Sequence, residues 1–217
     1  MPRYRHLIWD WNGTILDDTA IVVEVMNGLL RARGLRALTE DRYRQVFTFP
    51  VRSYYEAVGF DLEAEPFADL AAEWLAGFRS RWRAASIRSG AVVTLKTLAG
   101  LGLTHSLLSA AEQQLLREQA AHFGIADAFA GLVGIDDHHA ESKVEHGRRW
   151  LADSGIDPAT VLLVGDTIHD YEVAEALGVD VVLFAGGHQS RSRLESCGVP
   201  VVERLDEVLT FVGSEPA

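Results

Sequence analysis

The chain has 217 residues but a single cysteine, Cys197, so an internal disulfide and a cysteine-based metal cluster are both excluded. Such sparing use of cysteine is typical of proteins from a reducing compartment. No apolar run approaches the roughly 20 residues that a membrane helix requires, and residues 1–6 reach the first predicted strand without the apolar region of a signal peptide. We therefore expect a soluble, cytoplasmic protein that does not enter a membrane.

The chain also lacks an excess of positive charge, because its formal net charge is −11 at pH 7. Long-range attraction to nucleic acid or to anionic membranes is thus disfavoured, and any anionic ligand must be drawn by a local site. A hydrophobic content of 48% is enough for a substantial core. The sequence contains no internal repeat, and it leaves a monomer and a homodimer equally open.

Short apolar runs alternate with helical stretches along most of the chain. We predict strands at residues 6–10, 105–109, 131–134, 161–165, 181–185 and 199–202. This alternation indicates an α/β fold, with a parallel Rossmann-like sheet, right-handed crossovers and helices on both faces. The core domain would comprise residues 1–16 and 89–217.

Residues 17–88 separate the first two predicted strands by far more residues than one crossover requires. Asp18 is placed to cap a helix, and a later helix carries an aromatic stripe that includes Trp74, Phe78 and Trp82. The stripe is more typical of a buried core than of a surface for stacking bases. These residues therefore predict a small helical domain inserted into the core domain.

Two apolar runs each stop at an aspartate beside a glycine, at Asp10 near the start and at Asp166 near the end. Each aspartate would lie at the carboxyl end of a buried strand, which is where open parallel sheets bind ligands. Paired carboxylates at one edge favour a divalent cation, and hard oxygen ligands suit Mg²⁺. The alternative is that each aspartate only caps the element that follows it.

Further polar residues complete a series along the chain. In order, Asp10, Ser109, Lys143 and Asp166 with Asp170 resemble the four motifs of the haloacid dehalogenase superfamily. The resemblance covers nearly the whole chain and is closest to the phosphoglycolate phosphatase branch. It implies an aspartate-nucleophile phosphatase whose inserted residues 17–88 form a helical cap domain.

The resemblance also implies a role for each matched residue. Asp10 would attack phosphorus and form an aspartyl phosphate. Mg²⁺ would be bound by Asp10, Asp166 and the backbone carbonyl of Asn12, with Asp170 acting through a metal-bound water or through Lys143. Lys143 would offset the negative charges of the nucleophile and of the phosphoryl group.

Phosphate oxygens would be held by Ser109 and by the backbone N–H groups that follow it, beginning with Ala110. Thr14 is expected to brace the loop of the first motif or to contact the substrate. In the capped relatives a turn such as residues 47–52 faces the active site. Arg52, or alternatively Arg44, would then reach a substrate anion, although a solvated arginine on a turn is equally consistent with the sequence.

Asn12 departs from the family pattern, because the phosphatases have a second aspartate at this position. That aspartate protonates the leaving group and later activates water, which a carboxamide cannot do. His169 and His188 are candidate replacements. The cluster at residues 136–139 (Asp-Asp-His-His) is a third candidate and also a possible transition-metal site, but a solvated polar loop explains it better.

Three functions remain open at this stage. The favoured one is Mg²⁺-dependent hydrolysis of a small phosphorylated metabolite. The second is cleavage of a C–X or C–P bond, since superfamily members with those activities also lack the second aspartate. The third is a binding or regulatory protein that retains the phosphate site and has lost turnover.

Overall fold

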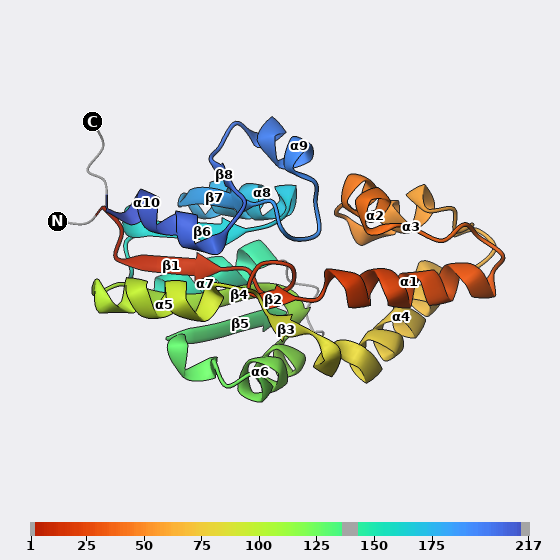
Figure 1. Cartoon of the computed structure of the whole chain (residues 1–217), viewed down its shortest axis with the longest axis horizontal. Helices are drawn as coiled ribbons and strands as arrows, with labels where there is room; N and C mark the ends of the chain where they lie inside the picture. The colour runs from red at the N-terminus through yellow and green to blue at the C-terminus, as the bar shows by residue number, and fades with distance from the viewer. Residues whose placement is uncertain (1–2, 136–142, 214–217) are drawn as a thin grey trace.

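The computed structural model describes residues 3–135 and 143–213 (Figure 1). Its centre is a six-stranded parallel sheet with the strand order β5-β4-β1-β6-β7-β8. The strands are β1 (His6–Trp9), β4 (Thr104–Glu112), β5 (Gly131–Ile135), β6 (Val161–Gly165), β7 (Asp180–Phe184) and β8 (Val201–Val202). The predicted α/β fold with a parallel sheet is confirmed.

All six predicted strands are present, with shifts at their ends. The strand after residue 104 continues to Glu112 through an irregularity between Leu108 and Glu112, because its pairing with β5 shifts register there. β8 is shorter than predicted and pairs only with β7. The central strand β1 pairs in parallel with β4 on one side and β6 on the other.

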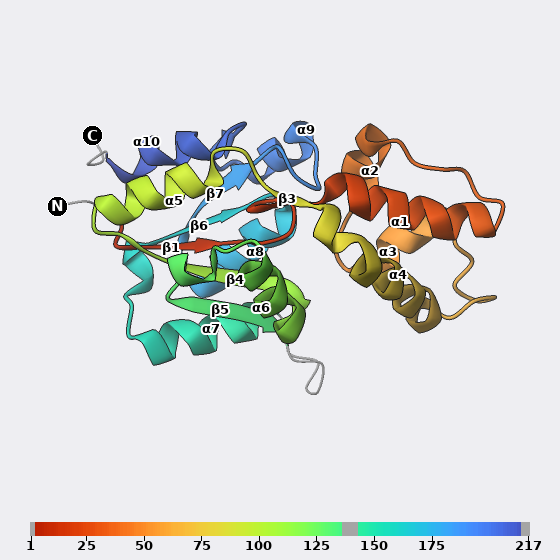
Figure 2. The ribbon, with the colours of Figure 1, turned by 60° about the horizontal axis from the view of Figure 1, so that its bottom comes forward.

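Helices cover both faces of the sheet (Figure 2). Alternate residues of each strand point to opposite faces: Leu7 and Trp9 pack with α5 (Ala91–Gly100), α6 (Gln113–His122) and α10 (Leu209–Val212). Ile8 points the other way and packs with α7 (Lys143–Ser154) and α8 (Ile168–Leu177). The core is therefore two apolar layers that hold β1 between them.

Four helices form the inserted unit, between β2 (Leu16–Asp17) and β3 (Ser86–Ile87), which pair as a short antiparallel ribbon. They are α1 (Thr19–Ala32), α2 (Glu40–Val46), α3 (Val51–Ala57) and α4 (Phe67–Arg81). Figures 1 and 2 place them beyond the carboxyl end of β1. Their apolar residues form a cluster distinct from those of the sheet, and Leu115 of α6 also packs into it.

The remaining elements are short. They are α9 (Arg191–Leu194) and the 3₁₀ helices η1 (Trp82–Ala84), η2 (Ala126–Ala128), η3 (Pro158–Thr160), η4 (Glu195–Cys197) and η5 (Leu205–Val208). Among all the described residues, no helix combines the length and the apolar character needed to cross a membrane.

Candidate active site

Asp10 is the first residue after β1 and is buried at the edge of the sheet that faces the insertion. Its backbone N–H donates to the carbonyl oxygen of Val164, 2.8 Å away, which continues the ladder with β6. Lys143, at the start of α7, donates to Asp10 Oδ1 and to Asp170 Oδ1, both at 2.6 Å. Residues far apart in the sequence thus meet at the end of the central strand, as predicted.

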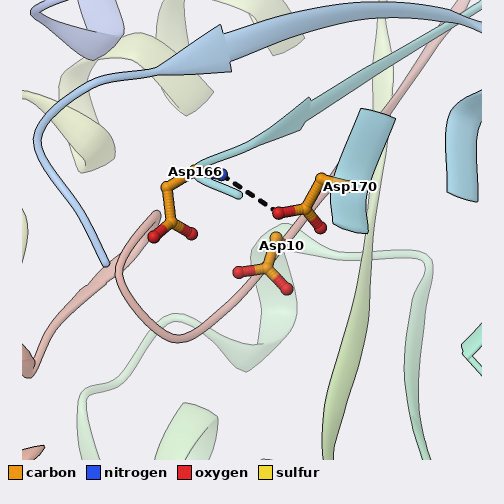
Figure 3. Close-up of side chains that lie close together, drawn as sticks. All are labelled: Asp10, Asp166 and Asp170. Carbon is orange, nitrogen blue, oxygen red and sulfur yellow. Dashed lines mark hydrogen bonds between the residues drawn. The ribbon is translucent and has the colours of Figure 1, made fainter. Parts of the chain in front are cut away.

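Asp166 and Asp170 complete a group of three buried carboxylates with Asp10, whose side chains point toward one another in Figure 3. One oxygen from each lies within 4.8 Å of the others. Asp166 follows β6 directly, and Asp170 lies in the first turn of α8. There Asp170 Oδ2 accepts hydrogen bonds from the backbone N–H of Asp166 at 3.2 Å and of Thr167 at 3.0 Å.

The charges in this group do not balance. Burial raises the pKa of the Asp10 carboxyl well above its usual range, and Asp170 and Asp166 raise it further, against the opposing effect of Lys143. Burial also raises the pKa of Asp166. Burial would lower the pKa of Lys143, but its two carboxylate partners raise it overall, so the lysine stays charged.

Three carboxylates that face one lysine leave an excess of negative charge in a buried space. The side-chain atoms that could bind a cation here are all carboxylate oxygens, the ligand type that Mg²⁺ prefers. A divalent cation would supply the missing positive charge and favour the ionised form of Asp10. The residues at this site therefore fit the cation that the resemblance implies.

The Asp166 carboxylate is fixed on both oxygens. Thr14 donates its hydroxyl hydrogen to Oδ1 at 2.9 Å, and the backbone N–H of His188 donates to Oδ2 at 2.6 Å. A Cβ at Gly13 or at Gly187 would lie within 2.3 Å of the same Oδ2 atom, so both positions need glycine. Thr14 therefore braces the loop of the first motif, which is one of the two roles predicted for it.

The Asn12 side chain belongs to a network that sequence reasoning missed. Its Nδ2 donates to Asp18 Oδ2 at 2.7 Å, and the backbone N–H of Gly13 donates to Asp18 Oδ1 at 3.0 Å. Asp18 was predicted to cap α1. It does occupy the N-cap position, but its side chain makes no capping hydrogen bond and turns toward Asn12 instead.

His188 continues this network on the other side of Asp18. Its Nε2 lies 3.4 Å from Asp18 Oδ1, and its Nδ1 lies 3.0 Å from the Tyr43 hydroxyl of α2. Burial would lower the pKa of His188, but Asp18, Asp166 and Asp10 raise it to about 9. The imidazole is therefore positively charged at neutral pH, and it links the core to the insertion.

Ser109 and Ala110 lie near the end of β4, beside Asp10, as predicted. The Ser109 hydroxyl is buried and accepts a hydrogen bond from the backbone N–H of Ala111 at 3.0 Å. Its oxygen can still donate its own hydrogen to a ligand. Both residues line the same cavity as Asp10 and Lys143.

The two predicted anion-binding arginines point elsewhere. Arg52 is exposed, and its Nε lies 3.4 Å from Glu56, one helical turn along α3. Phe49 and Val51, from the same segment, line the cavity in its place. The prediction for Arg52 is not supported because the start of α3 directs this side chain into solvent.

Arg44 has a structural contact instead. Its Nε donates to the carbonyl oxygen of Gly187 at 3.0 Å and its Nη2 to Glu40 at the same distance. His169 stacks on Phe49 with a centroid separation of 4.5 Å. The cluster at residues 136–139 lies outside the described residues.

A cavity of about 370 Å³ opens above Asp10, between the sheet edge and the insertion. The core contributes the acids, Ser109 and Lys143, and the insertion contributes mainly apolar and aromatic side chains from all four of its helices. The arrangement places the Asp10 carboxylate, the positive charge of Lys143 and a group of acids that fits a divalent cation at one end of the cavity. Such a site can bind and attack a phosphoryl group.

Known proteins resemble this chain over most of its length. It is 25% identical over 191 residues to a phosphoglycolate phosphatase of Rhodobacter capsulatus, a match that covers 84% of this chain and 85% of that protein. It is 27% identical over 180 residues to an N-acetylmuramic acid 6-phosphate phosphatase of Pseudomonas putida, covering 81% and 80% of the two proteins.

The structure of protein tyrosine kinase A from Mycobacterium tuberculosis has the same fold, with a TM-score of 0.82, 23% identity and coverage of 98% of this chain and 99% of that one. Residues 7–184 match the sequence pattern of one family, described as haloacid dehalogenase-like hydrolase. Because this match spans most of the chain, the protein belongs to the haloacid dehalogenase-like hydrolase family.

Proposed function

We propose that the protein is a Mg²⁺-dependent phosphatase that hydrolyses a small phosphorylated metabolite through an aspartyl phosphate on Asp10. The observation that carries the proposal is the contact of Asp10 with Lys143 at 2.6 Å, beside two further buried acids, in a site that opens into a cavity. The two sequence relatives with phosphatase names support the same reaction class.

In this reaction an ionised oxygen of Asp10 attacks phosphorus, and the bond between phosphorus and the ester oxygen breaks. Water then attacks the aspartyl phosphate, which releases inorganic phosphate and restores the carboxylate. Lys143 reduces the repulsion between the nucleophile and the incoming anion. When bound, Mg²⁺ held by Asp10, Asp166 and the Asn12 carbonyl would supply further positive charge for the same purpose.

The phosphate oxygens are held by the end of β4. The Ser109 hydroxyl and the backbone N–H of Ala110 are the donors at this position. Thr14 acts indirectly, since it fixes Asp166 through a hydrogen bond of 2.9 Å. Asp170 in turn orients Lys143 at 2.6 Å.

Asn12 sets the limit on the leaving group. Its carboxamide cannot protonate a departing alkoxide, so esters of weakly acidic alcohols should react slowly. Esters of phenols, and acyl phosphates, need less protonation and should react faster.

The insertion acts as a cap that excludes water from this site. Several contacts join it to residues 187–193 of the core, among them Tyr43 with His188, Arg44 with Gly187, and the Gln189 side chain with the carbonyl oxygen of Phe47 at 3.0 Å. Substrate entry would require these contacts to open, with the β2–β3 ribbon as the connection.

The test is phosphate release from acetyl phosphate, phenyl phosphate and glycerol phosphate with and without Mg²⁺, together with fluoroberyllate binding. We expect Mg²⁺-dependent release and a fluoroberyllate complex that requires Asp10. Binding of phosphate without release from any ester or acyl phosphate would show a binding protein instead.

A further inference from the structure

The walls that the insertion gives to the cavity are largely apolar. They include Met26, Phe47, Phe49, Trp74 and Phe78, and Leu115 of α6 adds to them. Phe47 meets Phe49 and Tyr54 edge-on, with centroid separations of 5.5 and 5.3 Å, and the rings of Trp74 and Phe78 are stacked at 5.1 Å. Such surfaces favour contact with a flat, apolar group.

Positive charge is scarce in the same space. Lys143 is the sole lysine or arginine among the described residues that line the cavity, and it is already shared between Asp10 and Asp170. His188 faces Asp18. Because the described residues that line the cavity offer no further lysine or arginine, a second anionic group on the substrate would be buried without such a partner, which is costly.

Two hydrogen-bonding groups of wall residues, the Tyr54 hydroxyl and Trp74 Nε1, have no partner among the described residues. Both atoms are buried, so these two residues line the cavity with the apolar parts of their rings.

We propose that the organic part of the substrate is an uncharged, predominantly aromatic alcohol, so that the phosphatase acts on an aryl phosphate rather than on a carboxylated or sugar phosphate. This inference rests on the proposed function. The aryl ring occupies the insertion side of the cavity while the phosphate lies against Asp10 and Lys143. Phosphoglycolate, the substrate in the name of one relative, has a carboxylate that this cavity does not match.

The chemistry of Asn12 agrees with this substrate class. When an oxygen of Asp10 bonds to phosphorus, the ester P–O bond breaks and its electron pair leaves on a phenolate, which later takes a proton from water. A phenolate is stable enough to leave without a general acid. The carboxamide of Asn12 and the aromatic wall therefore point to the same kind of leaving group.

The test uses binding, so that it does not depend on turnover. Calorimetry in Mg²⁺ compares 2-naphthylmethylphosphonate with phosphonoacetate, which carries a carboxylate in place of the ring. We expect the naphthyl compound to bind at least about ten-fold more tightly, from the apolar area that it buries. Equal or tighter binding of phosphonoacetate, or no binding of either compound, would overturn the inference.

A charge placed at the cavity mouth sharpens the comparison. Leu75 lines the cavity and is 37% exposed, so Leu75→Arg should fold and should lower the ratio of naphthyl to carboxylate affinity by about ten-fold or more. Leu101→Arg, at a position that is 59% exposed at the end of α5, is the matched control and should leave the ratio unchanged. An unchanged ratio in the Leu75 variant would contradict the assignment.

Acetyl phosphate separates this inference from the proposed function. If it is hydrolysed while phosphonoacetate binds more tightly than the naphthyl compound, the phosphatase stands and the substrate class is wrong. If the naphthyl compound binds more tightly while nothing is hydrolysed, the preference of the cavity for an aryl ligand stands and the proposed reaction is wrong.

Discussion

The two ends of the cavity are held together by different forces. At the core end, buried charged groups are fixed by short hydrogen bonds, such as those of Lys143 with two carboxylates. At the insertion end, aromatic rings pack against one another, and two hydrogen-bonding groups have no partner among the described residues. If the proposed function holds, chemistry and selectivity depend on separate segments of the chain, and substitutions should change each without the other.

Asp10→Asn should abolish the reaction at the core end of the cavity. An amide of the same shape packs in the same place but cannot attack phosphorus, so phosphate release should fall by at least about 10⁴-fold. Thermal unfolding, measured alongside, should show that the variant is folded. If the variant keeps a tenth of the wild-type rate, Asp10 is not the nucleophile.

Asn12→Asp should add a general acid at the core end of the cavity. The new carboxyl would lie against Asp18 at the present hydrogen-bond distance of 2.7 Å, and two carboxyls so close share a proton. A proton held there can be donated, so hydrolysis of alkyl phosphates should accelerate by about 10²-fold or more, equivalent to roughly 3 kcal/mol of barrier. Acetyl phosphate cleavage should change much less.

Intact-mass analysis must accompany that assay, because the Asn12-Gly13 pair is prone to deamidation and a converted fraction would imitate the variant. An unchanged or slower alkyl-ester rate would mean that another group supplies the proton. His188, the charged imidazole beside Asp18, would be the next position to test.

Acidification should weaken the core through His6, which is buried at the start of β1 between Thr104 and Ser106 hydroxyls at 2.7 and 2.9 Å. Burial lowers the pKa of His6 to about 4. The unfolded chain takes up a proton near pH 6.5 and the folded chain does not. His6 therefore stabilises the fold above pH 6.5, and this contribution is lost as the pH falls toward 4.

The full loss is about 3 kcal/mol. Urea unfolding at pH 7 and pH 4.5 measures it, and His6→Asn is the control, since it removes the titrating group and should make the pH dependence shallower. If wild type and variant lose stability in parallel, His6 is not the source.

The smallest effect is expected where the insertion meets the core at the surface. Arg79 of α4 pairs with Glu112, and both side chains are partly exposed. Arg79→Gln should change stability by less than about 1 kcal/mol and KM by less than about five-fold. Arg204→Gln, which removes another exposed pair far from the cavity, provides the comparison. A larger change in KM alone would show that this contact governs closure.

The core end of the site could be predicted because strand ends are visible in a sequence. Apolar runs that stop at Asp10 and Asp166 place both residues at one edge of a parallel sheet. Ser109 follows the same logic, whereas Lys143, at the start of a helix, was placed by the family resemblance, and all four lie together as predicted. Which of them act in catalysis remains a prediction.

The insertion end could not be predicted in the same way, because helix periodicity does not say how a helical unit is placed over the sheet. Arg52 was predicted to face the substrate and instead faces Glu56 and solvent. Asp18 has the sequence position of a helix cap, and only its three-dimensional neighbours show that its carboxylate serves Asn12. The aromatic stripe of α4 and η1 was predicted as a core, and its Trp74 and Phe78 belong both to that core and to the cavity lining.

Asp170 has two structural roles that complicate the interpretation of its variants in a genetic screen. One of its oxygens accepts from Lys143, while the other closes the capping box with Thr167 that begins α8. A single carboxylate thus contacts the lysine of the proposed active site and also stabilises the start of a helix, so a screen that scores activity alone would not separate the two losses. Inactive Asp170 alleles will therefore include proteins that are merely scarce in the cell, and protein abundance has to be measured before any of them is read as a catalytic defect.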